Sequence, residues 1–147
     1  MTSSKKEQTP SENGAKKWKI PPDRVKSDDC AINVGRVIED GEITDAGTPY
    51  YVHIGEWVEV LPCRSLAEIM ALSDIATDAM NGVDSLRQLC AELSRRLVGW
   101  NWTGMDSQPL AQPFDNPGLL ETLTDDELMW LLGAAKGEET TEARKNA

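Results

Sequence analysis

The feature that most constrains the fold is a pair of amphipathic helices encoded by the second half of the chain. Residues 84–98 place apolar side chains at spacings of three and four, with charged side chains on the opposite face. Asp84 is positioned to cap this helix, and Gly99 follows its end. An earlier helix is predicted to begin after Ser65, which opens a capping box, and to stop at residues 81–82, an Asn-Gly pair. The second half of the chain is therefore expected to be largely helical.

A further helix is expected after a proline-rich link. Thr124 and Glu127 have the spacing of a second capping box, and Asp125 and Asp126 fall where the positive end of the helix dipole favours acids. An apolar stripe follows, and Gly137 ends the helix. Adjacent acids on a helix do not face each other, so N-terminal capping explains this pair better than acid–base catalysis.

The segment before the helices has the pattern of β structure. A β-branched run over residues 32–38 ends at residues 40–41, an Asp-Gly dipeptide of the kind favoured in two-residue turns. Residues 50–54 and 57–60 alternate on either side of a glycine and predict a second hairpin. We therefore expect an α+β fold, in which a small antiparallel β unit of two hairpins precedes a helical C-terminal half.

The two ends of the chain differ from the middle in charge and composition. Residues 1–29 carry seven basic and five acidic side chains, a net charge of +2, which leaves −12 for the rest of a chain whose total is −10. This segment has too few apolar residues to offset its ordering entropy, so we expect a disordered basic tail. A solubilising role and contact with acidic partners or nucleic acid are both open for it. Residues 30–136 are expected to form a single α+β domain, and residues 137–147 a frayed C-terminal tail.

Composition excludes several classes of protein. An overall charge of −10 argues against direct binding to nucleic acid, and no apolar run approaches the ~20 residues of a membrane span. Three widely spaced cysteines and a single histidine, His53, form neither a disulfide framework nor a metal site. His53 is expected to be a packing residue. The pattern shows no catalytic nucleophile, base and oxyanion set and no phosphate loop, so we expect no enzyme and no cofactor.

Large apolar side chains in the last third of the chain are candidates for partner binding. Tryptophan is enriched at interface hot spots, but it is also an ordinary core residue, and an apolar helical stripe fits either role. The first two tryptophans of the set alternate as in an extended segment and should point the same way. The candidate partner-binding residues are Trp100, Trp102, Leu128, Trp130, Leu131 and Leu132.

Several short sequence motifs in and around this region resemble those of a known family. They are the Gly-Glu-Trp-Val of residues 55–58, the Gly-Trp-Asn-Trp-Thr of residues 99–103, the Pro-Leu of residues 109–110, and the Thr-Asp-Asp-Glu-Leu of residues 124–128. Their order, over about residues 45–136, resembles that in small tail-assembly proteins of long-tailed bacteriophages, chiefly those of actinobacterial hosts.

The resemblance implies a tail-assembly chaperone that works in the host cytoplasm. Its partner would be the aggregation-prone tape-measure protein or another phage tail protein, and self-association is also open. An acidic exterior around an apolar groove, formed by the tryptophan pair and residues 128–132, would suit such a client.

Two alternatives come from other functional classes. A structural virion protein, of the tail or head-completion type, would use the β-rich residues 32–60 as a self-assembling surface. An acidic mimic of nucleic acid would block a host DNA-binding protein, but the carboxylates cluster at helix starts and at the C-terminus instead of spacing like phosphates.

Overall fold

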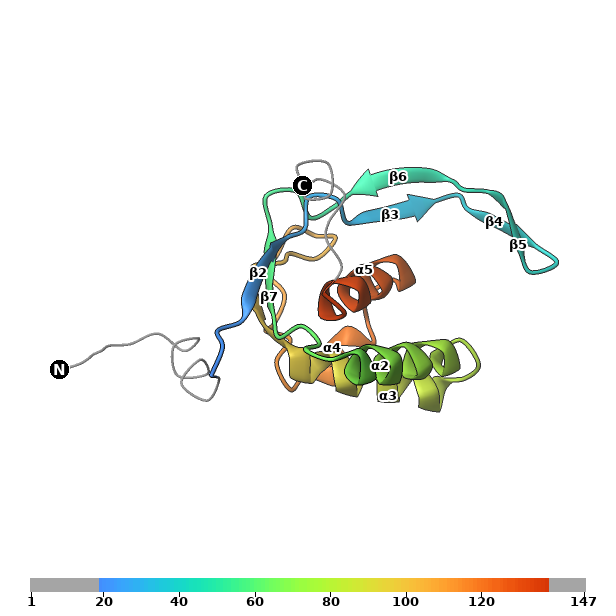
Figure 1. Cartoon of the computed structure of the whole chain (residues 1–147). Helices are drawn as coiled ribbons and strands as arrows, with labels where there is room; N and C mark the ends of the chain where they lie inside the picture. The colour runs from blue at the N-terminus through green and yellow to red at the C-terminus, as the bar shows by residue number, and fades with distance from the viewer. Residues whose placement is uncertain (1–18, 138–147) are drawn as a thin grey trace, which may run out of the picture.

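The computed structural model describes residues 19–137, and these form an α+β fold in which antiparallel strands precede helices, as the sequence predicts (Figure 1). None of the described helices is both long and apolar enough to cross a bilayer. The elements in chain order are β2 (Asp23–Lys26), β3 (Ala31–Val34), β4 (Val37–Glu39), β5 (Glu42–Asp45), β6 (Thr48–Tyr51), β7 (Trp57–Val60), α2 (Leu66–Ala79), α3 (Val83–Arg96), β8 (Leu97–Trp100), α4 (Pro117–Leu120) and α5 (Asp125–Ala135).

A three-stranded antiparallel sheet lies at the centre, with the strand order β2-β7-β8. In its register Val58 of the middle strand lies opposite Val25 on one side and Trp100 on the other. Val58 and Val60 are buried, whereas the residues between and before them are half-buried. This alternation turns one face of β7 toward the apolar core.

Two predictions for the strand region are wrong. β2 falls within residues 1–29, which the composition predicts as a disordered tail, because its backbone pairs along β7 and Val25 packs against the core. Residues 1–18 of that tail and residues 138–147 at the other end lie outside the described residues. The second hairpin does not form either: β6 pairs with β3, while β7 pairs with β2 and β8. The alternating pattern therefore marks two strands that belong to different sheets, joined by the turn at residues 52–56.

The helices begin close to where their capping residues predict. Ser65 caps α2 by accepting the backbone N–H of Glu68 at 3.2 Å, and Thr124 and Glu127 form the reciprocal capping box of α5. α3 begins at Val83, one residue before Asp84, and ends two residues earlier than predicted. Its expected last turn is extended because residues 97–100 pair with β7 as β8.

One apolar core joins the central sheet to the helices. It includes buried side chains from β7, β8 and each of the four helices within residues 19–137. Its largest members buried to less than 2% exposure are Trp102, Leu93, Leu97, Leu120, Leu131, Val58 and Val60.

The remaining strands form a ribbon that leaves this body. β3 pairs with β6 and β4 with β5, and Figure 1 shows the two pairs as one long antiparallel hairpin that passes α5 and projects beyond the helices. We call residues 31–51 the arm. Asp40 and Gly41 at its tip both have positive φ, 54° and 80°, which confirms the two-residue turn expected there. Gly47 also has a φ of 80°, and a Cβ atom at this position would lie 2.6 Å from the carbonyl oxygen of Val34.

Candidate functional site

The structure places most of the predicted partner-binding residues in the interior. Trp102 and Leu131 are fully buried, Trp100 and Leu132 are 3% exposed, and Leu128 is 7% exposed. The expectation that these side chains form an exposed groove is therefore wrong. They fill the space between the sheet, α3 and α5, which is the ordinary role of large apolar residues on amphipathic elements.

Trp130 is the sixth predicted residue, and it is only partly buried. Its indole N–H donates to a carboxylate oxygen of Asp29 at 3.0 Å, and its ring lies tilted against Trp102 with the centroids 6.0 Å apart. Trp100 and Trp102 do point the same way, as their spacing predicts: their rings stack at 4.8 Å with an interplanar angle of 6°. These three indoles are thus joined to one another and to the segment before β3.

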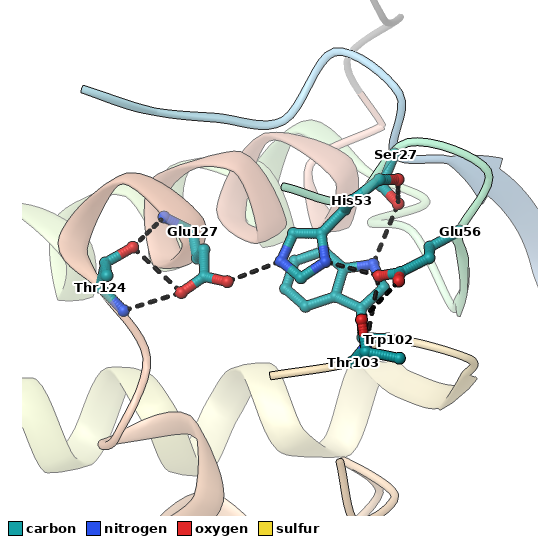
Figure 2. Close-up of polar contacts among 7 residues, drawn as sticks. All are labelled: Ser27, His53, Glu56, Trp102, Thr103, Thr124 and Glu127. Atoms are coloured by element: carbon teal, nitrogen blue, oxygen red, sulfur yellow. Dashed lines mark hydrogen bonds and ion pairs between the residues drawn. The ribbon is translucent and has the colours of Figure 1, made fainter. Parts of the chain in front are cut away.

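The stack of rings ends on the single histidine. His53 is 1% exposed, and its imidazole lies parallel to Trp102 with the centroids 3.7 Å apart. Figure 2 shows the ring between two carboxylates, with Nδ1 2.6 Å from Oε1 of Glu56 and Nε2 2.6 Å from Oε2 of Glu127. His53 is therefore a buried residue, as expected. Its two carboxylate partners, however, are not predicted by the sequence pattern around it.

We call His53, Glu56 and Glu127 the histidine cluster. Each of its two carboxylates accepts hydrogen bonds from a threonine. Glu56 accepts the backbone N–H of Thr103 at 3.2 Å through one oxygen and the Thr103 hydroxyl at 2.7 Å through the other. Glu127 accepts the backbone N–H and the hydroxyl of Thr124, both at 3.0 Å, so the α5 capping box and the histidine share one carboxylate (Figure 2). The positions of His53, Glu56 and Glu127 are thereby fixed by the turn after β6, the segment after β8 and the start of α5.

Hydrogen bonds surround both carboxylates that face the ring. Both oxygens of Glu56 accept hydrogen bonds from Thr103. Burial acts to raise the pKa of Glu127, but the hydrogen bonds from His53 and Thr124 outweigh it, and that pKa lies below its ordinary value. A carboxylate oxygen faces each ring nitrogen at 2.6 Å, and two ionised carboxylates in these positions would be matched by a donor at both nitrogens. The geometry therefore suits an imidazolium at His53.

A hydroxyl and a thiol lie near the imidazole, and each is engaged or protonated. Ser27 donates its hydroxyl to the backbone carbonyl of His53 at 3.3 Å and accepts the indole N–H of Trp102 at 3.0 Å, so its oxygen is not paired with the imidazole. Burial, reinforced by the charge of Glu127, raises the pKa of Cys30 to about 12, which keeps that thiol protonated at neutral pH. Over residues 19–137, no group of three or more His, Cys, Asp or Glu side chains is arranged to hold a metal ion.

A second set of charged contacts holds the first leg of the arm. Arg36 donates to Asp126 at 3.0 Å and to Asp125 at 2.8 Å, and the backbone N–H of Asn33 donates to the other oxygen of Asp126 at 2.9 Å. Asp125 and Asp126 therefore do more than favour the helix dipole. Together with Glu127 they form an acidic first turn of α5 whose three side chains all bind the arm or the turn that follows it.

Sequence reasoning missed this link because it joins residues about ninety positions apart. The signal that could have found it is the lone basic residue of the arm, Arg36, among the acidic side chains that follow. A basic side chain at the root of an otherwise acidic hairpin needs an anionic partner, and the acidic turn of α5 is the densest such group in the helical half.

Exposed apolar side chains gather on the arm. All residues of β4, β5 and β6 are exposed. Beyond Arg36, residues 37–51 hold four acids and no base. The large apolar side chains of the arm that lie at 41% to 60% exposure are Val34, Val37, Ile38, Ile43, Tyr50 and Tyr51. An exposed apolar surface with open strand edges is typical of a binding element.

Comparison with known proteins adds no relative. No family model matches the chain, and no significant match is found to a curated protein or to a solved structure. What the chain does has therefore to be inferred from its own residues. The likeness to phage tail-assembly proteins depends on the short sequence words alone.

Proposed function

We propose that this chain is a non-catalytic binding protein of phage tail assembly, and that the arm is the surface through which it joins another tail protein. The observation that supports this proposal is the arm itself, a hairpin that leaves the body and exposes six large apolar side chains. A two-stranded ribbon is marginally stable by itself, so further strands or apolar cover from a partner would stabilise it.

The charge of the arm indicates the kind of surface it would bind. Its outer part, residues 37–51, carries Glu39, Asp40, Glu42 and Asp45 without a basic residue. A partner with an apolar groove framed by Lys and Arg would complement it, whereas the acidic body of a second copy would repel it. Electrostatic attraction of this kind raises the rate of association and depends on salt.

The partner proposed from the resemblance is the tape-measure protein, held in the host cytoplasm until the tail is built. A chaperone for such a client needs apolar surface for binding and acidic surface for solubility. The arm combines apolar and acidic surface within one hairpin. We therefore assign to the arm the client-binding role that the sequence predicts for the tryptophan pair and α5.

This proposal is tested with a double substitution at the tip of the arm. Ile38 and Ile43 lie opposite each other in the register and are each 60% exposed, so Ile38→Ser with Ile43→Ser removes apolar surface without opening the core. Each isoleucine buried by a partner contributes about 2 kcal/mol, so recovery of co-expressed tape-measure protein should fall at least tenfold.

A matched control lies on the helices. Leu66→Ser with Met70→Ser changes two exposed apolar residues of α2, which is not part of the arm, and should leave recovery unchanged. Circular dichroism should show that both variants keep the fold. Equal recovery with the arm variant and the unaltered chain would contradict the proposal.

A structural virion protein is the second candidate, and one observation favours it. The exposed part of the arm, residues 34–51, lies within residues 32–60, the region that such a protein would use to assemble. Mass spectrometry of purified virions separates the two roles, because an assembly chaperone leaves before the particle is complete and a structural subunit stays in it.

A further inference from the structure

The arm is attached to the body at two points, and both lie at the first turn of α5. The first leg is held through Arg36 and the backbone N–H of Asn33, which bind Asp125 and Asp126. The second leg ends at Tyr51, and two residues later His53 binds Glu127. Three consecutive acids of one helical turn therefore hold both legs.

The attachment at His53 is a titratable ring between two carboxylates. The ring is buried and faces a carboxylate oxygen at 2.6 Å from each nitrogen. If either nitrogen loses its proton, a ring lone pair faces an anionic oxygen at hydrogen-bonding distance, and a buried carboxylate loses its counter-charge. Removing one partner from a buried ion pair is far more disruptive than removing an exposed one.

The other charged and titratable groups around the cluster reinforce the need for that proton. Asp28, which accepts the backbone N–H of Gly55, belongs to the segment between β2 and β3, and so do Asp29 and Cys30. Asp126 lies beside Glu127 on α5, and Arg36 pairs with it from the arm. Among these groups Arg36 is the one cation, and Asp125 and Asp126 neutralise it, so none of the groups named can take the place of an imidazolium.

We propose that His53 is a charge latch for the arm: the root of the arm stays docked on α5 while the imidazole carries two protons, and it loosens when the ring loses one. The movement is confined to the turn after β6 and to the contacts of Asn33 and Arg36 with α5, because the body is held by its own core. This inference does not depend on what the arm binds.

The single histidine makes a direct test practicable, since its ring gives one set of nitrogen signals in NMR spectra of the full chain. The state of the arm root is followed at the amide of Asn33, which donates to Asp126 at 2.9 Å. The amide of Cys63, which donates to the carbonyl of Ala135 at 2.8 Å in the body, is the internal reference.

The expected result has two parts. At neutral pH both ring nitrogens carry protons. As the pH rises through the titration of the ring, the protection of the Asn33 amide against hydrogen exchange, corrected for intrinsic base catalysis, falls at least tenfold while that of Cys63 is unchanged.

Three results would overturn the latch. They are a neutral imidazole in the folded chain at neutral pH, protection of Asn33 that passes through the ring titration unchanged, and loss of protection at Asn33 and Cys63 together, which would show global unfolding instead of a local release.

Two variants sharpen the test. His53→Gln has no proton to lose and should show weak protection at Asn33 without the pH step. Arg24→Gln removes the exposed pair with Glu59 in the central sheet and should retain the step. If His53→Gln does not fold, the titration of the unaltered chain still decides the proposal.

Discussion

Replacing Trp102 by alanine separates a core residue from a docking residue. If the indole were partner surface, its removal would weaken binding and leave the fold intact. In the structure the ring is fully buried, stacked between His53 and Trp100, and its N–H donates to the hydroxyl of Ser27. We therefore expect Trp102→Ala to destabilise the fold itself.

The size of the effect follows from these contacts. Truncation of a buried tryptophan to alanine costs about 3–5 kcal/mol, and loss of the stacked pairs adds up to about 1 kcal/mol. Ser27 keeps its bond to the carbonyl of His53, so the lost indole hydrogen bond adds little. A total of about 3–6 kcal/mol is a large part of the stability of a domain of this size.

Urea unfolding followed by far-ultraviolet circular dichroism measures this loss. With a slope of about 1.5 kcal/mol per molar urea, the midpoint should fall by roughly 3 M. Met105→Ala is the matched control, since Met105 lies three residues further on and is 69% exposed, and its midpoint should move by less than about 0.5 M. Should Trp102→Ala fail to fold, Trp102→Phe retains a ring and should shift the midpoint by about 1 M. A shift no larger than that of the Met105 variant would refute the placement of Trp102 in the core.

Three further predictions concern the thiols, the acid sensitivity and the arm. Cys63 is half-exposed, so a thiol reagent should label it first in the folded chain, and the two buried cysteines should react only on unfolding. Because the pKa of Glu127 is below its ordinary value of 4.5, its contribution to stability is present above that pH and lost as the pH falls through the lowered value; Glu127→Gln should flatten the dependence of the urea midpoint on pH between 6 and 3. Gly47→Ala should speed amide exchange in the arm at a local cost of about 1–3 kcal/mol, since Gly47 has a φ of 80° and no room for a Cβ atom, whereas Gly118→Ala, with open space around it, should not.

Local signals allowed the helices to be predicted. Capping residues act on backbone groups three positions away, so Ser65 and Thr124 mark the start of α2 and α5 in the sequence as they do in the structure. The Asp-Gly turn at residues 40–41 is local in the same sense. The helix caps and this turn each depend on a few consecutive residues, so the residue types and their spacing are enough to predict them.

Pairing between distant segments could not be predicted in this way. Residues 48–51 and 57–60 alternate alike, but the first pairs with β3 in the arm and the second with β2 and β8 in the body. Alternation shows that a segment is extended without showing which strand lies beside it. The error about β2 has the same origin, because this short charged strand is ordered by pairing with β7 and by the packing of Val25 on the core.

The candidate partner surface was misplaced for a related reason. A tryptophan pair and a leucine stripe are compatible with a core and with an interface, and hydrophobicity alone does not decide between them. What decides is the number of elements that converge on the side chain. Sheet, helices and the histidine cluster all meet at Trp102, while Ile38 and Ile43 lie opposite each other on a two-stranded ribbon and are each 60% exposed.

The body and the arm have different roles, and this difference explains why the tryptophans and leucines are buried while the apolar side chains of the arm are exposed. A surface that gains and loses a partner has to do so without unfolding the protein. Residues such as Leu131 and Trp102 cannot form such a surface, because their burial supplies the stability of the body. The arm contributes little to the core and is held through charged contacts with the first turn of α5. Its apolar side chains can therefore be covered or uncovered while the core stays closed. The acids of that turn, which sequence alone assigns to the helix dipole, fix the direction in which the proposed binding surface is presented.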